Sequence, residues 1–325
     1  MNWQYSVFGI GNAIVDIISE VDEKVFSSLG LVKGSMNLID QDQSTLLLES
    51  ISKDHIRSPG GSAANSMAGI ASLGGNAAFA GKVAGDSLGK VFTNDMNLSG
   101  IDFLGSSSEC SQPTGTSIIL VTPDSQRTMN THLGIANEFS SDDFDSDGLE
   151  ASNIIFCELY LWDRPIAKKA IRRAISLVNK EAGQKISLSL SDTFCIERHH
   201  DEVFSLVEDS VDILFANEAE LTTLFGASLE ESMERLRDIT DIACITLGAE
   251  GSIIISESET IKIPAIGGID IVDTTGAGDQ YAAGVLFGIT NNYSLQEAGK
   301  IGSIAAGEVI SHFGPRPETS LASLI

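Results

Sequence analysis

Strand-length apolar runs that alternate with amphipathic helical stretches constrain the fold of this chain more than any other feature. Between several runs the spacing is helical, as in residues 165–180, where apolar side chains recur every three to five positions and basic ones fall between them. The strand-length runs lie at residues 6–11, 77–83, 117–123, 153–159, 185–191, 211–217, 242–248 and 252–256. Such alternation after about residue 150 predicts an α/β fold in which a doubly wound, mostly parallel sheet carries helices on both faces. In that architecture ligands bind at the carboxyl ends of the strands.

Two segments in the first half of the chain do not follow this alternation. Residues 12–52 and 106–134 are rich in Ser, Gly and Asp, and a long helical period occurs only near residues 43–51. The strand candidate at 116–121 has other short runs as neighbours instead of helices. We therefore predict that these two segments form a small β element. The rest of the chain is assigned to the α/β core, which comprises residues 1–11, 53–105 and 135–325.

The charge and cysteine content restrict the partners and the compartment. Asp and Glu number 45 against 20 Lys and Arg, and the net charge of −25 would repel nucleic acid and an anionic membrane surface. Residues 280–296, the least charged long stretch, are interrupted by glycines and asparagines, which is wrong for a membrane span. The four cysteines, Cys110, Cys157, Cys195 and Cys244, are spread singly, as reduced thiols are. Without a basic, apolar leader, the chain is expected in the cytoplasm, with small molecules as partners.

The strongest chemical motif is Asp273-Thr274-Thr275-Gly276-Ala277-Gly278-Asp279, which precedes a helix of small residues. A Gly-Ala-Gly turn at a helix start directs consecutive N–H groups and the positive end of the helix dipole at one point, where a transferring phosphoryl group can be held. Asp279 would repel a phosphate that is only bound, but it would accept the proton of a hydroxyl that attacks phosphorus. The motif thus favours phosphoryl transfer, with a capped acidic helix start as the alternative.

Polar residues near two other predicted turns are weaker signals. Gly60-Gly61 opens a helix that carries Asn65, an arrangement that suits a polyol but is equally typical of a simple turn. Asn12 and Asp16 follow the first predicted strand and have the donors and acceptors to share a pair of vicinal hydroxyls. A turn-forming Asn and a surface Asp explain the same two residues equally well.

Two later strand ends carry further polar groups. Asn217 and Glu220 offer oxygen ligands for hydrated Mg²⁺. Thr246, Gly248 and Gly251 form a glycine turn of the kind that a nucleotide can approach. Either signal alone is weak.

Taken together, these motifs resemble the ribokinase-like (PfkB-type) carbohydrate kinase family over nearly the whole chain. The resemblance is carried, in order, by Gly60-Gly61 with Asn65, Gly81 to Gly89, Asn217-x-x-Glu220, Thr246-x-Gly248-x-x-Gly251 and Asp273 to Asp279. Within the family, residues 11–16 and 61–66 are more similar to adenosine kinase and related nucleoside or sugar kinases than to ribokinase or fructokinase. Ala63 stands where ribokinase usually has a lysine, which disfavours free ribose as the substrate.

The resemblance implies an ATP- and Mg²⁺-dependent kinase that phosphorylates a primary hydroxyl of a nucleoside or a sugar. The small β element would be a lid that closes over the sugar and excludes water. Asp279 would be the general base, and the N–H groups of Gly276, Ala277 and Gly278 would form the anion hole. Arg127 in the lid would move onto the transferring phosphate, although an exposed turn arginine is an equal alternative.

The resemblance also implies which residues hold each ligand. The nucleoside or sugar would be held by Asn12, Asp16, Gly61, Ser62, Asn65 and Tyr160. ATP would lie along Asn217, Thr246, Gly248, Gly251 and Thr275, with Mg²⁺ and its waters ordered by Asn217 and Glu220. Candidates for a wall against a purine are Tyr160, Leu161 and Trp162, with Ile14 and Leu133, but core packing explains each of them equally well. A monovalent cation near Asp273 and the loop around Gly314 is permitted.

Other chemistries have little support. His199-His200 lacks the spacing of a metal-binding HExxH motif, no GxSxG motif is present, and Gly9-Ile10-Gly11 is not followed by the third glycine of a dinucleotide-binding turn. The alternative from another class is a catalytically idle nucleoside- or sugar-binding protein of the same fold. A monomer and a homodimer are both open. Gln280, directly after Asp279, stands where relatives commonly have a small residue and has no explanation at this level.

Overall fold

The computed structural model describes residues 3–33, 36–51, 55–109, 111–123 and 127–325. Cys110 lies outside these residues, whereas Cys157, Cys195 and Cys244 are buried free thiols. No helix within the described residues is long and apolar enough to cross a membrane.

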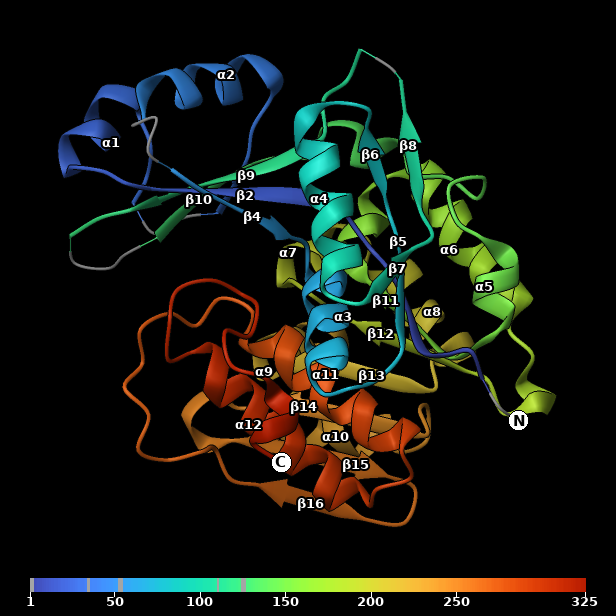
Figure 1. Ribbon diagram of the computed structural model, residues 1–325. Helices are drawn as coiled ribbons and strands as arrows, with labels where there is room; N and C mark the ends of the chain where they lie inside the picture. Colours follow the sequence, from blue (N-terminus) through green and yellow to red (C-terminus); the bar gives the residue numbers. More distant parts are fainter. Residues whose placement is uncertain (1–2, 34–35, 52–54, 110, 124–126) are drawn as a thin grey trace.

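A central sheet forms the middle layer of the molecule (Figure 1). Its strands are β1 (Tyr5–Ile10), β5 (Ala77–Ala80), β7 (Ile101–Phe103), β11 (Ser152–Glu158), β12 (Lys185–Ser189), β13 (Ile213–Asn217), β14 (Ile242–Thr246), β15 (Ser252–Ser256) and β16 (Thr260–Ile263). Their spatial order is β16-β15-β14-β13-β12-β11-β1-β5-β7. Pairing is parallel from β14 to β7, and only β15 and β16 at one edge run antiparallel. Strands such as β11 and β13 are buried on both faces, which explains why their sequences are continuous apolar runs.

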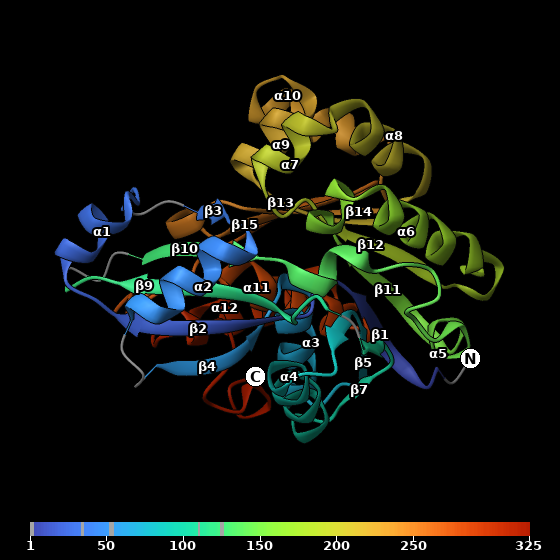
Figure 2. The same ribbon diagram turned by 90° about the horizontal axis from the view of Figure 1, so that it is seen from above.

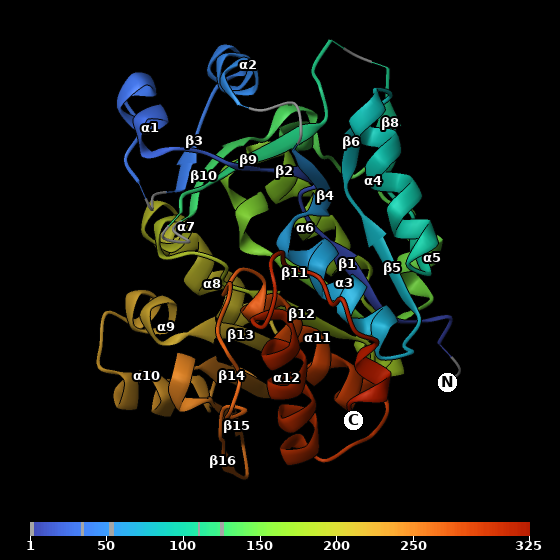
Figure 3. The ribbon, with the colours of Figure 1, turned by 60° about the vertical axis from the view of Figure 1, so that its left-hand side comes forward.

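Helices cover both faces of the central sheet (Figure 3). One layer consists of α3 (Ser62–Ser72), α4 (Ser87–Leu98), α11 (Ala277–Thr290) and α12 (Leu295–Val309). The other consists of α5 (Ser146–Glu150), α6 (Pro165–Leu177), α7 (Thr193–Arg198), α8 (His200–Ser210), α9 (Glu218–Phe225) and α10 (Leu229–Leu236). Neighbouring residues of β1 point to opposite faces of the sheet. Val7 packs into the core with α3 and α11, whereas Phe8 packs into the core with α6 and α8. The predicted doubly wound, mostly parallel α/β fold is confirmed.

A smaller sheet stands to one side of the central sheet (Figure 2). It contains β2 (Ile14–Glu20), β3 (Met36–Leu38), β4 (Ile56–Gly60), β9 (Gly115–Val121) and β10 (Arg127–His132), in the order β3-β10-β9-β2-β4. The helices α1 (Glu23–Leu29) and α2 (Gln41–Ser50) cover one face, where they pack on Ile118 and Leu120 of β9. Side chains alternate along a strand, so Ser117 and Ile119 of β9 point to the opposite face. That face lines the candidate site.

The hydrogen bonding of three short strands differs from the predicted division of the chain. β4 pairs with β2 in the small sheet, although residues 53–105 were assigned to the core. β8 (Ser106–Ser108) pairs with β6 (Lys82–Ala84) and not with the small sheet, although it falls within 106–134. The run at 77–83 divides between β5 and β6, which lie in different sheets. β4 is an edge strand with a proline, a sequence without a recognisable strand pattern.

Candidate active site

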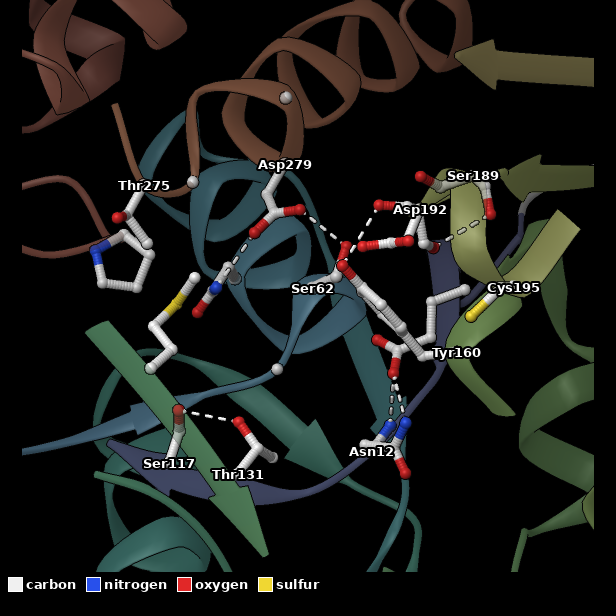
Figure 4. Close-up of a pocket in the computed structure, with 18 of the residues that line it drawn as sticks. Asn12, Ser62, Ser117, Thr131, Tyr160, Ser189, Asp192, Cys195, Thr275 and Asp279 are labelled. Carbon is white, nitrogen blue, oxygen red and sulfur yellow. Dashed lines mark hydrogen bonds between the residues drawn. The ribbon is translucent and has the colours of Figure 1, made fainter. Parts of the chain in front are cut away.

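A cavity of about 760 Å³ lies between the carboxyl ends of the central strands and the inner face of the small sheet (Figure 4). The strand ends contribute Asn12 after β1, Asn217 of β13 and Thr246 of β14. The small sheet contributes Ser117 and Thr131, whose hydroxyls are 3.0 Å apart. This is the place where a doubly wound sheet holds its ligands, and the volume suits a small molecule.

Asp279 lies in the first turn of α11, at the wall of this cavity. Its Oδ1 accepts a hydrogen bond from Ser62 Oγ at 2.6 Å (Figure 4), and its Oδ2 accepts one from Asn65 Nδ2 at 3.0 Å. Burial raises the pKa of Asp279 to about 6, while the two hydrogen bonds lower it. The carboxylate is therefore largely ionised at neutral pH, and its pKa is high enough for it to accept a proton.

The turn before Asp279 exposes backbone donors to the cavity. Gly276 is the N-cap of α11 with φ of 79°, and a Cβ there would meet Pro315 Cα at 2.6 Å, so the position requires glycine. Gly276 and Gly278 line the cavity, and no acceptor is found for their N–H groups within the described part of the chain. The N–H of Ala277 instead donates to Thr274 O at 3.2 Å, and Ala277 does not line the cavity. Two of the three predicted donors therefore lie at the cavity with N–H groups that a ligand could use.

The start of α3 brings Gly61, Ser62 and Asn65 to the opposite side of Asp279. Gly61 has φ of 98°, and a Cβ at this residue would meet Asn12 O at 2.2 Å. The glycine therefore lets the start of α3 approach the turn after β1. All three residues line the cavity, as predicted from the sequence.

Asp16 is a buried carboxylate that also lines the cavity. Only 6% of the residue is exposed, and no hydrogen-bond donor to its side chain is found among the described residues. Burial raises its pKa to about 7, and the guanidinium groups of Arg316 and Arg127 oppose that increase. A buried carboxylate without a donor is costly unless a ligand supplies one.

Glu158, at the end of β11, holds Asn12 in place and was not identified from the sequence. Its Oε1 accepts from the backbone N–H and from Nδ2 of Asn12, and its Oε2 accepts from Ala63 N, each at 2.8 Å. Burial raises the pKa of Glu158 to about 7, and these hydrogen bonds oppose the increase. Because Asn12 directs its NH₂ group at Glu158, its carbonyl oxygen is left for the cavity. The available signal was an acidic residue that ends an otherwise apolar strand.

Asn217 and Glu220 lie side by side at the start of α9 and form a capping box. Asn217 Oδ1 accepts from Glu220 N at 2.8 Å, while the Glu220 carboxylate accepts from the N–H and the Nδ2 of Asn217. Burial raises the pKa of Glu220 to about 7, and the Asp192 and Asp279 carboxylates add to the increase. Each carboxylate oxygen keeps a lone pair, so the pair fits hydrogen bonds from metal-bound water. No cluster of three or more His, Cys, Asp or Glu side chains that could ligate a metal directly occurs within the described residues.

Four of the predicted site residues do not line the cavity: Ala277, Arg127, Gly248 and Gly251. The two glycines close the turn between β14 and β15, where Gly251 N donates to Gly248 O at 3.1 Å. The remaining predicted site residues, including Tyr160 and Thr275, line the cavity.

Arg127, at the start of β10, is paired with the Asp273 motif instead of facing the cavity. Its Nη2 lies 2.9 Å from Asp273 Oδ2, and its guanidinium lies over the ring of Phe313 at 5.2 Å. Burial lowers the pKa of Arg127, and Nη1 and Nη2 have no well-directed hydrogen-bond acceptor in the described part of the chain. The side chain is 10% exposed, so the alternative of an exposed turn arginine is wrong. Residues 124–126 of the same predicted lid segment lie outside the described residues.

The predicted wall of the base pocket divides into two groups. Tyr160, Ile14 and Leu133 line the cavity. Leu161 and Trp162 are 2% and 0% exposed and belong to the apolar core, so the core alternative is right for both.

Several lining residues were missed by sequence reasoning. On the small sheet these are Leu38, Ser117, Ile119, Met129 and Thr131. Beyond β12 they include Ser191, whose φ of 63° is unusual for a residue with a side chain, and Asp192. Tyr160 OH donates to Ser191 O at 3.1 Å, which connects two strand ends at the cavity. Neither the inner face of the small sheet nor this turn has a recognisable motif.

Comparisons with known proteins find relatives that cover most of the chain. The family described as pfkB family carbohydrate kinase matches residues 34–320. The solved structure of adenosine kinase from Sinorhizobium meliloti is 42% identical, with a TM-score of 0.92 and coverage of 99% of this chain and 98% of that one. A probable sugar kinase protein from Rhizobium etli CFN 42 is 39% identical, with the same coverage and TM-score. Aminoimidazole riboside kinase from Salmonella typhimurium is 28% identical over 253 residues, which are 76% of this chain and 78% of that protein.

Proposed function

The chain belongs to the pfkB family of carbohydrate kinases and is thus an ATP-dependent phosphotransferase, and we propose that it phosphorylates the primary hydroxyl of a ribonucleoside, with adenosine as the first candidate. One observation carries the proposal: a single cavity holds Asp279 at a helix N-terminus together with the buried carboxylate of Asp16, which has no hydrogen-bond donor among the described residues. The first group suits phosphoryl transfer and the second suits a pair of vicinal hydroxyls.

The acceptor lies between the small sheet and the strand ends in this proposal. Asp16 accepts hydrogen bonds from the vicinal ribose hydroxyls, and Asn12 and Asn65 hold the sugar from the other side. Ile14, Ile119 and other apolar residues of the small sheet provide a surface for a purine ring. These apolar side chains favour a nucleoside over a free sugar.

Asp279 removes the proton of the attacking primary hydroxyl in this proposal. At neutral pH the carboxylate is ionised, and Ser62 and Asn65 hold its two oxygens in a fixed direction. The N–H groups of Gly276 and Gly278 and the positive end of the α11 dipole stabilise the charge of the transferring phosphoryl group. Arg127 adds a cation when it leaves Asp273, and this role is supported by the lack of a well-directed acceptor for its Nη1 and Nη2 groups among the described residues.

ATP is proposed to run from the Gly276 turn toward Thr246, past Thr275 and Asn217. A Mg²⁺ ion bound to its phosphates would neutralise the charge that develops in the transfer. Asn217 and Glu220 would hold this ion through its water ligands, because their side chains are already paired with each other. Gly248 and Gly251 keep the turn beside that region tight.

The test is Mg²⁺-dependent release of ADP from ATP with adenosine, inosine, guanosine, ribose and fructose, scored as kcat/KM for each acceptor. We expect a preference for a nucleoside of about 100-fold over ribose, since the base adds contacts that the sugar lacks. An Asp279→Asn preparation made in the same way controls for contaminating kinases. A preference for ribose or fructose would contradict the nucleoside assignment, and measurable binding without turnover would favour an idle binding protein.

A further inference from the structure

The amide of Asn65 is oriented by an arginine that comes from the C-terminal segment. Arg316 Nε donates to Asn65 Oδ1 at 3.3 Å, and Asn65 Nδ2 donates to Asp279 Oδ2 at 3.0 Å. An arginine side chain has hydrogen-bond donors only, so the carbonyl oxygen of the amide must face Arg316. With the amide reversed, a carbonyl oxygen would face the carboxylate of Asp279, and the hydrogen bond would be lost.

Arg316 is itself held in one position by groups on α4. Its Nη1 is paired with the carboxylate of Asp95, its Nη2 contacts Met96 Sδ at 3.6 Å, and its side chain is 13% exposed. The contacts join α3 and α4 to the chain after α12, which lies more than 200 residues away in the sequence. In Figure 3 the C-terminal segment runs beside α3 and α11.

Gln280 anchors the segment that precedes Arg316. This residue is fully buried, and its Nε2 donates both to Asn65 O and to Pro315 O, each at 2.9 Å. A small residue at this position would leave both carbonyl groups without this donor. Gln280 therefore fixes the backbone of Asn65 and the residue that precedes Arg316 at the same time.

We propose that Arg316 is a positioning residue for Asp279, which acts by orienting the Asn65 amide and is anchored by Gln280. The proposal rests on the proposed function, because it takes Asp279 to be the general base. Arg316 does not line the cavity, so it acts on Asp279 through Asn65, whereas its charge separately lowers the pKa of Asp16. Arg316 then supports the proposed base from outside the cavity, although Pro315 directly before it lines the cavity.

Several titratable groups surround Asp279. They act on its carboxylate electrostatically, whereas Arg316 acts on it through the hydrogen bond that Asn65 donates. Asp16 on β2, Glu158 on β11, Tyr160 after it and Glu220 on α9 all interact electrostatically with Asp279. None of these residues donates a hydrogen bond to the Asp279 carboxylate, whereas Ser62 and Asn65 do. Loss of the Asn65 donor destabilises the ionised carboxylate and moves its titration to higher pH.

The experiment is a double-mutant cycle of Arg316→Met and Asn65→Ala, with kcat measured against pH at saturating ATP and adenosine. Arg316→Met is expected to lower kcat about tenfold, as the loss of a hydrogen bond to a charged group does. It should also shift the acid limb of kcat to higher pH and leave KM for ATP within about twofold. In the Asn65→Ala background the same substitution should have no further effect on kcat, because its route is already removed.

Two further variants separate positioning from folding. Arg237→Met is the matched control, since Arg237 also donates to several acceptors, Ser256 O and Thr260 Oγ1 among them, but away from the cavity. It should leave kcat and its pH profile unchanged. Arg316→Lys keeps the charge and a hydrogen-bond donor, so its kcat should be at least about threefold higher than that of Arg316→Met. If Arg316→Met does not fold, Arg316→Lys replaces it in the cycle.

The possible outcomes separate failure of the positioning role of Arg316 from failure of the proposed function. An active wild type with an Arg316→Met variant of unchanged kcat and pH profile would overturn the positioning role alone. Equal losses in both backgrounds of the cycle would also overturn it, because they would show a route that bypasses Asn65. A wild type without turnover on any acceptor would refute the proposed function, and the positioning role would fall with it.

Discussion

At the residue scale, burial and hydrogen bonding have opposite effects on the pKa of the Asp279 carboxyl group. Burial raises the pKa of Asp279, and the hydrogen bonds from Ser62 and Asn65 limit the increase, so that the value is about 6. A general base must be ionised to accept a proton. The turnover number of the wild type is therefore expected to fall as the pH decreases through about 6.

The substitution Asp279→Asn tests this role directly. It keeps the shape of the side chain and removes the proton acceptor, so kcat should decrease by roughly 10² to 10⁴, the usual scale for one general base. Binding of ATP and adenosine, measured by calorimetry, should stay within about threefold because no ligand contact is removed. Asp212→Asn is a suitable control, since Asp212 caps Ile186 N away from the cavity. A variant with near-normal turnover would exclude Asp279 as the base.

At the element scale, Arg127 connects the small sheet to the motif at the start of α11. β10 supplies the arginine, and the loop before α11 supplies Asp273, which also accepts from Gly314 N at 3.0 Å. The ion pair is desolvated on both sides, with side-chain exposures of 10% and 3%. Loss of one partner leaves an uncompensated buried charge, which is more damaging than loss of a surface pair.

Arg127→Met is expected to loosen the small sheet and to lower kcat. Amide hydrogen exchange in β9 and β10 should become faster, because their link to Asp273 is removed. The turnover number should fall by about tenfold or more if the same guanidinium also serves the phosphate. Arg57→Met, on the exposed edge strand β4 of the same sheet, is the control and should change neither quantity. Unchanged exchange and turnover in Arg127→Met would contradict both roles.

At the scale of the whole molecule, the charge balance predicts how stability depends on pH. The chain carries a net charge of −25, and burial raises the pKa of Asp16, Glu158 and Glu220 to about 7 each. A carboxyl group with a raised pKa binds more protons in the folded state than in the unfolded one. Its contribution is complete below the unfolded pKa and is lost as the pH rises through the folded pKa.

The ligand-free protein should therefore be more stable at pH 6 than at pH 8. We expect a difference of about 3 °C in the midpoint of thermal unfolding, followed by circular dichroism. Added NaCl at about 0.5 M screens the surface repulsion but not the buried groups, so part of the difference should persist. A midpoint that rises between pH 6 and pH 8 would contradict this account.

The sequence by itself determined the class of fold, and most of the site residues that it predicted line the cavity. Apolar runs mark strands that are buried on both faces, and helical periodicity marks the layers that cover them, because both patterns are local consequences of backbone geometry. The glycine turn before Asp279 was recognisable for the same reason, since a helix start and its donors lie within a few residues. Gly61, Asn65, Asn217 and Thr246 likewise follow local turn signals.

Only the tertiary structure decided which distant groups meet. Glu158 and Asn12 are 146 residues apart in the chain, and Arg316 and Asn65 are 251 apart, so no local pattern connects them. The pairing of β4 with β2, and of Arg127 with Asp273, depends on how the small sheet rests on the central one. Periodicity specifies which face of an element is buried, whereas the partner across that face is chosen by packing and desolvation of the whole chain.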